Sequence, residues 1–137
     1  MEYISAEEFR KQPVEVQNLF IDWWKPSIGG LFNYKEDDEH DCIEVECIQS
    51  KNRLRTIALT GVIPLLTEGQ LRKFIEDKTE YRVDCCLYEG TYDINICENN
   101  GLYIKKYEDI DKDLLQAYWK VAVQIAEQEV QANADRK

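Results

Sequence analysis

Apolar and polar residues alternate most regularly between Tyr81 and Tyr107, and this pattern predicts a three-stranded antiparallel meander. Counting outward from a two-residue turn at Glu89-Gly90 pairs apolar residues of the first two strands, namely Leu87 with Tyr92, Cys85 with Ile94 and Val83 with Ile96. A three-residue turn with Gly101 in the left-handed conformation then sets Ile96 opposite Ile104. All of these side chains share one face of the meander, which we expect to be buried.

Helical periodicity predicts one long helix and three shorter ones. The long C-terminal helix runs from about Asp111 to Gln131, and its apolar face consists of Ile110, Leu114, Tyr118, Ala122, Ile125, Ala126 and Val130. We expect this face to cover the apolar face of the meander. Capping boxes at 5–8 and 67–70 open a short N-terminal helix and a central helix that ends near Asp77. Pro13 suits the first turn of another helix, whose apolar stripe is Val16, Leu19, Phe20 and Trp23.

The segment between the second helix and the central helix predicts further strands. Residues 31–34 form a short strand, and Ile43–Cys47 alternates with a period of two. A turn at 51–53 pairs the latter strand with Leu54–Leu59 and sets Cys47 opposite Ile57. We therefore expect an α+β fold in which an antiparallel sheet of about five strands is covered by the C-terminal helix. Residues 1–137 form a single domain in this prediction, with frayed ends at 1–12 and 132–137.

The composition is that of an acidic globular protein. The 137 residues include 17 Lys and Arg against 27 Asp and Glu, a formal net charge of −10, and 44% are hydrophobic. That hydrophobic content excludes a chain that is disordered throughout. The charge argues against direct binding to nucleic acid, because phosphates repel an acidic surface. The sequence contains neither an apolar stretch of about 18–20 residues nor a secretory leader, so we expect a cytoplasmic protein that does not bind membranes.

Residues suited to nucleophilic catalysis or metal binding are scarce. The single histidine, His40, lies among carboxylates that favour its charged form, whereas a general base must be neutral. Five cysteines, an odd number, fit reduced thiols. The spacing of Cys42 and Cys47 sets their side chains on opposite sides of a strand, and no second pair of zinc-knuckle type follows. We expect no catalytic residue, no metal and no cofactor.

Two other functions remain as alternatives at this point. A metal-dependent enzyme acting on nucleotides or nucleic acid would present carboxylates from strands, as do Glu44, Glu46, Asp84 and Asp93. Their alternation, however, sets these carboxylates on the solvent side of the sheet, which is typical of a polar outer face. A homo-oligomeric binder of a small phosphorylated ligand would need positive charge, which Arg53 with Arg55 or Lys105 with Lys106 would supply.

The residues expected to contact a partner are of two kinds. The first kind is acidic: the run Glu36, Asp37, Asp38, Glu39 and Asp41, with the outward-facing Glu44 and Glu46. Carboxylates spaced over a rigid surface can occupy a basic groove meant for phosphates, although many acidic surfaces serve only solubility. The second kind is aromatic: Trp24 and Trp119 each follow another aromatic residue, so the two neighbours cannot share one narrow helical stripe. These tryptophans are either interface anchors or part of a wide buried face.

Three motifs carry a resemblance to a family: Trp23-Trp24-Lys25-Pro26, the segment Ile63–Leu71 and the segment Leu114–Trp119. With these motifs the chain resembles small early-region proteins of phages and prophages of Gram-positive bacteria. The resemblance extends from the second helix to the last and implies action inside the host bacterial cell. Small acidic phage proteins include inhibitors of bacterial defence, such as anti-CRISPR proteins, and this last step is an analogy of size, charge and setting.

The sequence thus predicts a non-enzymatic, phage-encoded acidic binding protein that occupies a host protein with a basic surface. By the same analogy, its target is a nucleic-acid-binding surface of a defence system such as CRISPR-Cas, which the chain blocks as a nucleic-acid mimic. The prediction is compatible with a homo-oligomer, and the metal-dependent enzyme is the alternative.

Overall fold

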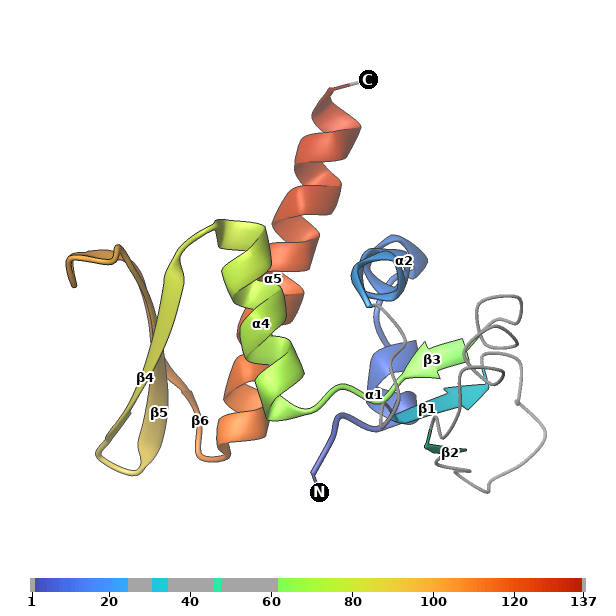
Figure 1. The fold of residues 1–137 in the computed structure, drawn as a ribbon, viewed down its shortest axis with the longest axis horizontal. Helices are drawn as coiled ribbons and strands as arrows, with labels where there is room; N and C mark the ends of the chain where they lie inside the picture. The colour runs from blue at the N-terminus through green and yellow to red at the C-terminus, as the bar shows by residue number, and fades with distance from the viewer. Residues whose placement is uncertain (1, 25–30, 35–45, 48–61, 137) are drawn as a thin grey trace. The chain divides into compact units, whose positions relative to one another are not determined.

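The structure is a computed structural model that describes residues 2–24, 31–34, 46–47 and 62–136 (Figure 1). The chain divides into two compact units, one of Ile4–Leu66 and one that joins Met1–Tyr3 to Thr67–Lys137. The expected single domain stays a prediction. Among the described helices, none combines the length and the apolar character that a bilayer crossing needs.

The first unit combines two helices with a small antiparallel sheet. Its elements are α1 (Ala6–Arg10), α2 (Val14–Trp23), β1 (Leu31–Tyr34), β2 (Glu46–Cys47) and β3 (Val62–Pro64), and the sheet order is β2-β1-β3. The Ser5 side chain accepts a hydrogen bond from the Glu8 N–H at 3.2 Å and so caps α1. Phe9 of α1 and Phe20 of α2 are both buried and meet edge to face, with ring centroids 6.1 Å apart.

The strands of the first unit match the sequence only in part. The short strand expected at 31–34 is confirmed as β1. Residues 46–47 pair with β1, whereas the expected pairing of Cys47 with Ile57 lies outside the described residues. Strand β3, which pairs with the other side of β1, was not expected. The apolar run 62–66 contains β3 and shows no period-two alternation in the sequence. Ile63, Leu65 and Leu66 are all buried, as is usual for such a run.

The second unit is a three-stranded meander with two helices on one of its faces. Its elements are α4 (Glu68–Thr79), β4 (Arg82–Tyr88), β5 (Thr91–Cys97), β6 (Tyr103–Asp111) and α5 (Leu114–Asp135), with sheet order β4-β5-β6. Helix α5 contacts β5, β6 and α4, and both helices lie on the same side of the sheet (Figure 1). The α+β class, the meander and the C-terminal helix are therefore confirmed. The single sheet of about five strands is not, because the described strands form two three-stranded sheets.

The pairing of β4 with β5 follows the predicted register. Leu87 lies opposite Tyr92, Cys85 opposite Ile94 and Val83 opposite Ile96. The two turn residues, Glu89 and Gly90, both have positive φ, 51° and 85°, as the tight hairpin turn requires. Turn chemistry and alternation therefore fix the register of this hairpin. The expected burial of its whole apolar face is wrong at Cys85 and Leu87, which are exposed because they lie on the edge strand.

The predicted pairing of Ile96 with Ile104 is wrong, because a bulge shifts the register. The three-residue turn itself is present: Gly101 has φ 88°, and the Glu98 N–H donates to the Leu102 carbonyl at 2.9 Å. One step further on, the register shifts, so that Ile96 lies opposite Lys105. Ile104 is the extra residue of the bulge and is 46% exposed.

Helix α5 starts later, and is buried more widely, than the sequence predicts. Strand β6 extends to Asp111, and the Asp113 side chain caps α5 by accepting from the Gln116 N–H at 3.0 Å. Four residues outside the predicted apolar face are also buried: Leu115, Ala117, Trp119 and Val121. Because α5 packs against both α4 and the sheet, a single face cannot hold all of its contacts.

Thr67 begins α4 with a complete capping box. Its hydroxyl accepts from the Gln70 N–H at 3.4 Å, and Gln70 Oε1 accepts from the Thr67 N–H at 2.9 Å. We expect Thr67→Ala to lower the free energy of unfolding by about 1 kcal/mol, because it leaves a helix N–H without its partner. Urea denaturation followed by circular dichroism measures this change. A Thr67→Ser variant retains the acceptor and serves as the control; a loss as large in this variant would contradict the capping role.

The link between the end of β6 and α5 contains an ion pair. Lys120 Nζ lies 2.7 Å from Asp111 Oδ2, and the Asp113 N–H donates to Asp111 Oδ1 at 2.9 Å. The Lys120 hydrogen bond, followed by that from the Asp113 N–H, holds the pKa of the Asp111 carboxyl below its ordinary value.

Asp111 therefore contributes stability above the pKa that it has in the unfolded chain, and this stability is lost as the pH falls through its lowered folded pKa. We expect Lys120→Gln to be less stable than wild type by under about 1 kcal/mol at pH 6, since the side chains of Lys120 and Asp111 are 51% and 25% exposed and solvent screens the pair. The difference should shrink below about pH 4, the ordinary pKa of an aspartate, and be lost as the pH falls through the lowered pKa of Asp111 in the folded chain. Thermal melts across pH 2–6 test this, and a difference that is constant with pH would contradict it.

Candidate functional site

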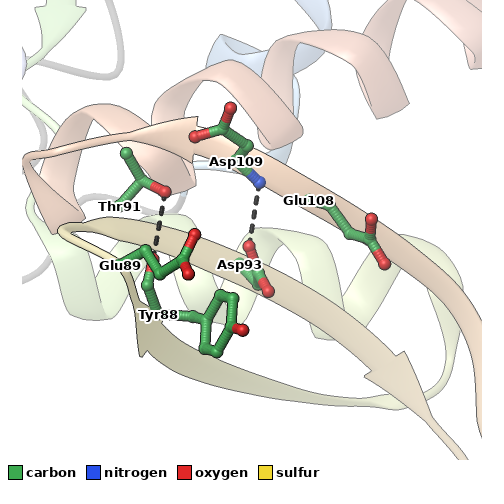
Figure 2. Close-up of a pocket in the computed structure, with 6 residues that line it drawn as sticks. All are labelled: Tyr88, Glu89, Thr91, Asp93, Glu108 and Asp109. Carbon is green, nitrogen blue, oxygen red and sulfur yellow. Dashed lines mark hydrogen bonds between the residues drawn. The ribbon is translucent and has the colours of Figure 1, made fainter.

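The described part of the second unit contains an acidic hollow on the open face of its sheet. The hollow has a volume of about 500 Å³ and is lined by Tyr88, Glu89, Thr91, Asp93, Glu108 and Asp109. Figure 2 shows these side chains on all three strands and on the turn between β4 and β5. Asp93 precedes the buried Ile94, so alternation turns its side chain away from the helices.

The turn between β4 and β5 forms one side of the hollow. The tight turn at Glu89-Gly90 ends β4 at Tyr88 and starts β5 at Thr91. The Thr91 hydroxyl donates to the Tyr88 carbonyl at 3.3 Å, across the turn (Figure 2). Tyr88, 63% exposed, presents its ring to the hollow beside the Glu89 carboxylate.

A wide irregularity in β6 places the opposite side. Tyr92 pairs with Asp111, and Ile94 pairs with Tyr107. The single residue Asp93 of β5 therefore lies opposite three residues of β6, 108–110. Asp109 has φ 53°, and its N–H donates to Asp93 Oδ1 at 2.8 Å (Figure 2). The Asp93 carboxylate therefore bonds directly to the bulged backbone of β6, which brings Glu108 and Asp109 to the hollow.

The four carboxylates of the hollow form no ion pair with the described part of the chain. Other carboxylates of this unit are paired: Glu76 lies 2.9 Å from Arg72, Asp77 2.9 Å from Lys73, and Glu129 3.1 Å from Lys78. In contrast, Glu89, Asp93, Glu108 and Asp109 form none of the ion pairs among described residues, and neither Lys nor Arg lines the hollow. The hollow is therefore a region of concentrated negative charge.

The chemistry of the hollow suits an organic cation. Carboxylates accept hydrogen bonds from guanidinium or ammonium groups, and the exposed face of a tyrosine ring also attracts a cation. Among the described residues, no group of three or more His, Cys, Asp or Glu side chains has the arrangement of a metal site.

Most of the acidic residues expected at the site lie outside the described residues. These are Glu36, Asp37, Asp38, Glu39, Asp41 and Glu44. Glu46 belongs to β2 and pairs with Phe32, but its side chain is also outside the description. The proposal that these residues contact a partner stays a prediction.

The two tryptophans expected as anchors are both buried. Trp24 follows the end of α2 and is 8% exposed, and Trp119 lies in α5 and is 5% exposed. This burial favours the alternative that the sequence left open, a wide buried helical face.

The carboxylates and cysteines of the meander occupy ordinary structural positions. Asp84 lies 3.5 Å from Arg82 and accepts from Cys97 Sγ at 3.3 Å. Cys85, Cys86 and Cys97 are free thiols, of which Cys97 is buried. Burial raises the pKa of the Cys97 thiol, so that it stays protonated and unreactive near neutral pH.

Sequence reasoning had placed Asp93 on a strand but missed the hollow as a whole. The Glu89-Gly90 turn was the one local signal for its position. The irregularity that carries Glu108 and Asp109 toward Asp93 has no signature, because residues 103–111 read as a plain strand followed by a helix start. In comparisons with protein-family models, curated proteins and solved structures, this chain matches none of them.

Proposed function

We propose that this chain is a non-enzymatic binding protein that occupies a basic surface of a partner protein with its acidic hollow. The observation that carries the proposal is the gathering of four carboxylates, without a cation among the described residues, around one hollow. An arginine or lysine side chain of a partner is the chemical complement of that hollow. The exposed ring of Tyr88, 63% accessible, adds apolar surface that lines it.

The finer proposal concerns the partner. The carboxylates of the hollow and the phosphates of a nucleic acid both present negatively charged oxygens. A protein surface that binds the hollow is therefore suited to binding nucleic acid as well. Together with the resemblance to early-region phage proteins, this supports a host protein that binds nucleic acid, such as a component of a defence system of the CRISPR-Cas kind. In this proposal the chain acts in the cytoplasm of the host bacterium. No described residue arrangement favours the metal-dependent alternative, and we do not propose it.

Affinity capture with two matched variants tests this function. The hollow variant combines Glu89→Gln, Asp93→Asn and Glu108→Gln, and the control variant combines Glu80→Gln, Glu98→Gln and Glu127→Gln. The control residues are all exposed and lie away from the hollow. Both variants change the formal net charge from −10 to −7, so that they differ only in where the charge is removed.

Each tagged protein is incubated with lysate of a Gram-positive host at about 50 mM and about 500 mM salt. We expect wild type and the control variant to retain the same protein at low salt, and the hollow variant to lose it. High salt should release it from both, because a charged interface is screened. Equal retention by all three proteins, or retention by none, would contradict the proposal.

A further inference from the structure

Strand β4 forms an edge of its sheet, and it pairs with β5 on one side only. In a two-residue hairpin the residues that flank the turn form a hydrogen-bonded pair, and the pattern alternates from there along both strands. Tyr88 and Thr91 flank the turn here. The backbone groups of the even-numbered residues of β4 therefore bond to β5, whereas those of Val83, Cys85 and Leu87 point outward.

The outward carbonyl of Val83 is already hydrogen-bonded to a side chain of α4. Arg72 Nη2 donates to it at 3.2 Å, which independently shows that this carbonyl points away from β5. The Leu87 carbonyl has a long contact, 3.9 Å, from Cys86 Sγ. Among the hydrogen bonds of the described residues, the outward N–H groups of Cys85 and Leu87 and the Cys85 carbonyl have no partner. The unpaired backbone groups therefore lie in the second half of β4, which we call the free edge.

The opposite edge of the sheet, β6, is protected, whereas the free part of β4 is not. Strand β6 carries Lys105 and Lys106, and it has two register irregularities, one of them at the positive-φ residue Asp109. Lysines and bulges are the usual devices that prevent pairing of sheet edges. Residues 85–88 are Cys-Cys-Leu-Tyr, all four exposed, without a charge, a proline or a bulge. An edge of this kind is a template for another strand.

We infer that β4 pairs with β4 of a second copy of this chain, antiparallel, about a two-fold axis at Cys86. In this register the outward groups of Cys85 meet those of Leu87 in the other copy, with two hydrogen bonds for each such pair. An axis at Cys85 would need the outward groups of Val83, where Arg72 already holds the carbonyl. An axis at Leu87 would pair Cys85 with Glu89, which lies in the turn with φ 51°. The free groups therefore favour the axis at Cys86, and the two meanders join into one continuous sheet.

Charge favours a second copy in this orientation. Arg82 starts β4 and lies 3.5 Å from Asp84 of the same strand, Glu89 follows the end of β4, and the centre from 85 to 88 carries no charge. Antiparallel pairing brings Arg82 of one copy beside Glu89 of the other, whereas a parallel strand would place like charges together. This inference does not depend on the proposed function, because it rests on the free backbone groups of β4, although Tyr88 and Glu89 also line the acidic hollow.

Oligomeric state tests the free edge. At about 0.15 M salt, where distant charges are screened, sedimentation velocity should show a concentration-dependent species of twice 16.2 kDa. Leu87→Lys places a charge on the free edge and should weaken this dimer at least about tenfold. Ile104→Lys, an exposed position on β6, is the matched control and should leave the dimer unchanged. A monomer up to about 300 μM, or equal weakening by both variants, would overturn the inference.

Cross-linking tests the register. Residues directly opposite at a non-hydrogen-bonded pair have Cα atoms about 4.5 Å apart, within the range of a disulfide. With copper phenanthroline and dioxygen as oxidant, the two Cys86 thiols should lose two electrons and two protons and form a disulfide between the copies. Cys85→Ser should keep the cross-link, whereas Cys86→Ser should lose it. A cross-link that survives in Cys86→Ser would overturn the register.

Discussion

Replacing Ile94 with alanine is expected to lower the free energy of unfolding by about 2–4 kcal/mol. Ile94 is fully buried in the central strand of the meander, opposite Cys85 on one side and Tyr107 on the other. Its removal leaves a cavity in the layer between the sheet and α5, which contacts β5 directly.

Urea denaturation followed by tryptophan fluorescence measures this loss. Leu102→Ala is the control, because Leu102 is 64% exposed and has little apolar contact to lose. We expect the control to stay within about 0.5 kcal/mol of wild type. If Ile94→Ala were equally mild, the meander and α5 would not share the core described above.

Neutralising the acidic hollow is expected to weaken the binding of an arginine-rich peptide by about tenfold. Exposed ion pairs contribute about 0.2–1 kcal/mol each, so the loss of three carboxylates amounts to about 1.4 kcal/mol, which corresponds to that factor. The probe is a nine-residue arginine peptide, titrated calorimetrically at about 50 mM salt against the hollow variant and the control variant defined above.

The control variant should bind the peptide within about twofold of wild type, because its charges lie away from the hollow. Equal weakening in both variants would mean that total charge, not its arrangement, determines binding. In that case the hollow would have no particular role, although the chain would still be an acidic binder.

The sequence predicted well those parts of the fold that rest on local chemistry. The positive-φ turn at Glu89-Gly90, the Thr67 capping box and the period-two alternation of β4 and β5 each involve residues close in sequence. These signals fix a hairpin register or a helix start without reference to the rest of the molecule.

Bulges were the features that sequence reasoning could not predict. Ile104 leaves the expected face because it is an extra residue between two regular pairs. The local sequence Leu-Tyr-Ile-Lys-Lys contains no residue that predicts this bulge. The irregularity opposite Asp93 has the same character, and it assembles the hollow from residues far apart in the chain. The candidate site was therefore less predictable than the fold that supports it.

The tryptophans show a different limit of sequence reasoning. Two adjacent aromatic residues on a helix cannot share one narrow stripe, which leaves exposure and wide burial as alternatives, with wide burial slightly favoured. Helix α5 is packed on more than one side, by α4 and by the sheet, so that Tyr118 and Trp119 are both buried. The number of neighbours that a helix has is a property of the tertiary fold and cannot be read from its own periodicity.

The central claim, that the hollow binds cationic side chains by its negative potential, is tested most directly by nuclear magnetic resonance. Amide resonances of the ¹⁵N-labelled chain are followed during titration with the arginine peptide at low salt. The account predicts that the largest shifts fall on residues 88–93 and on Glu108 and Asp109, and that they vanish at high salt. Shifts spread evenly over the acidic surface, or centred away from these residues, would contradict it.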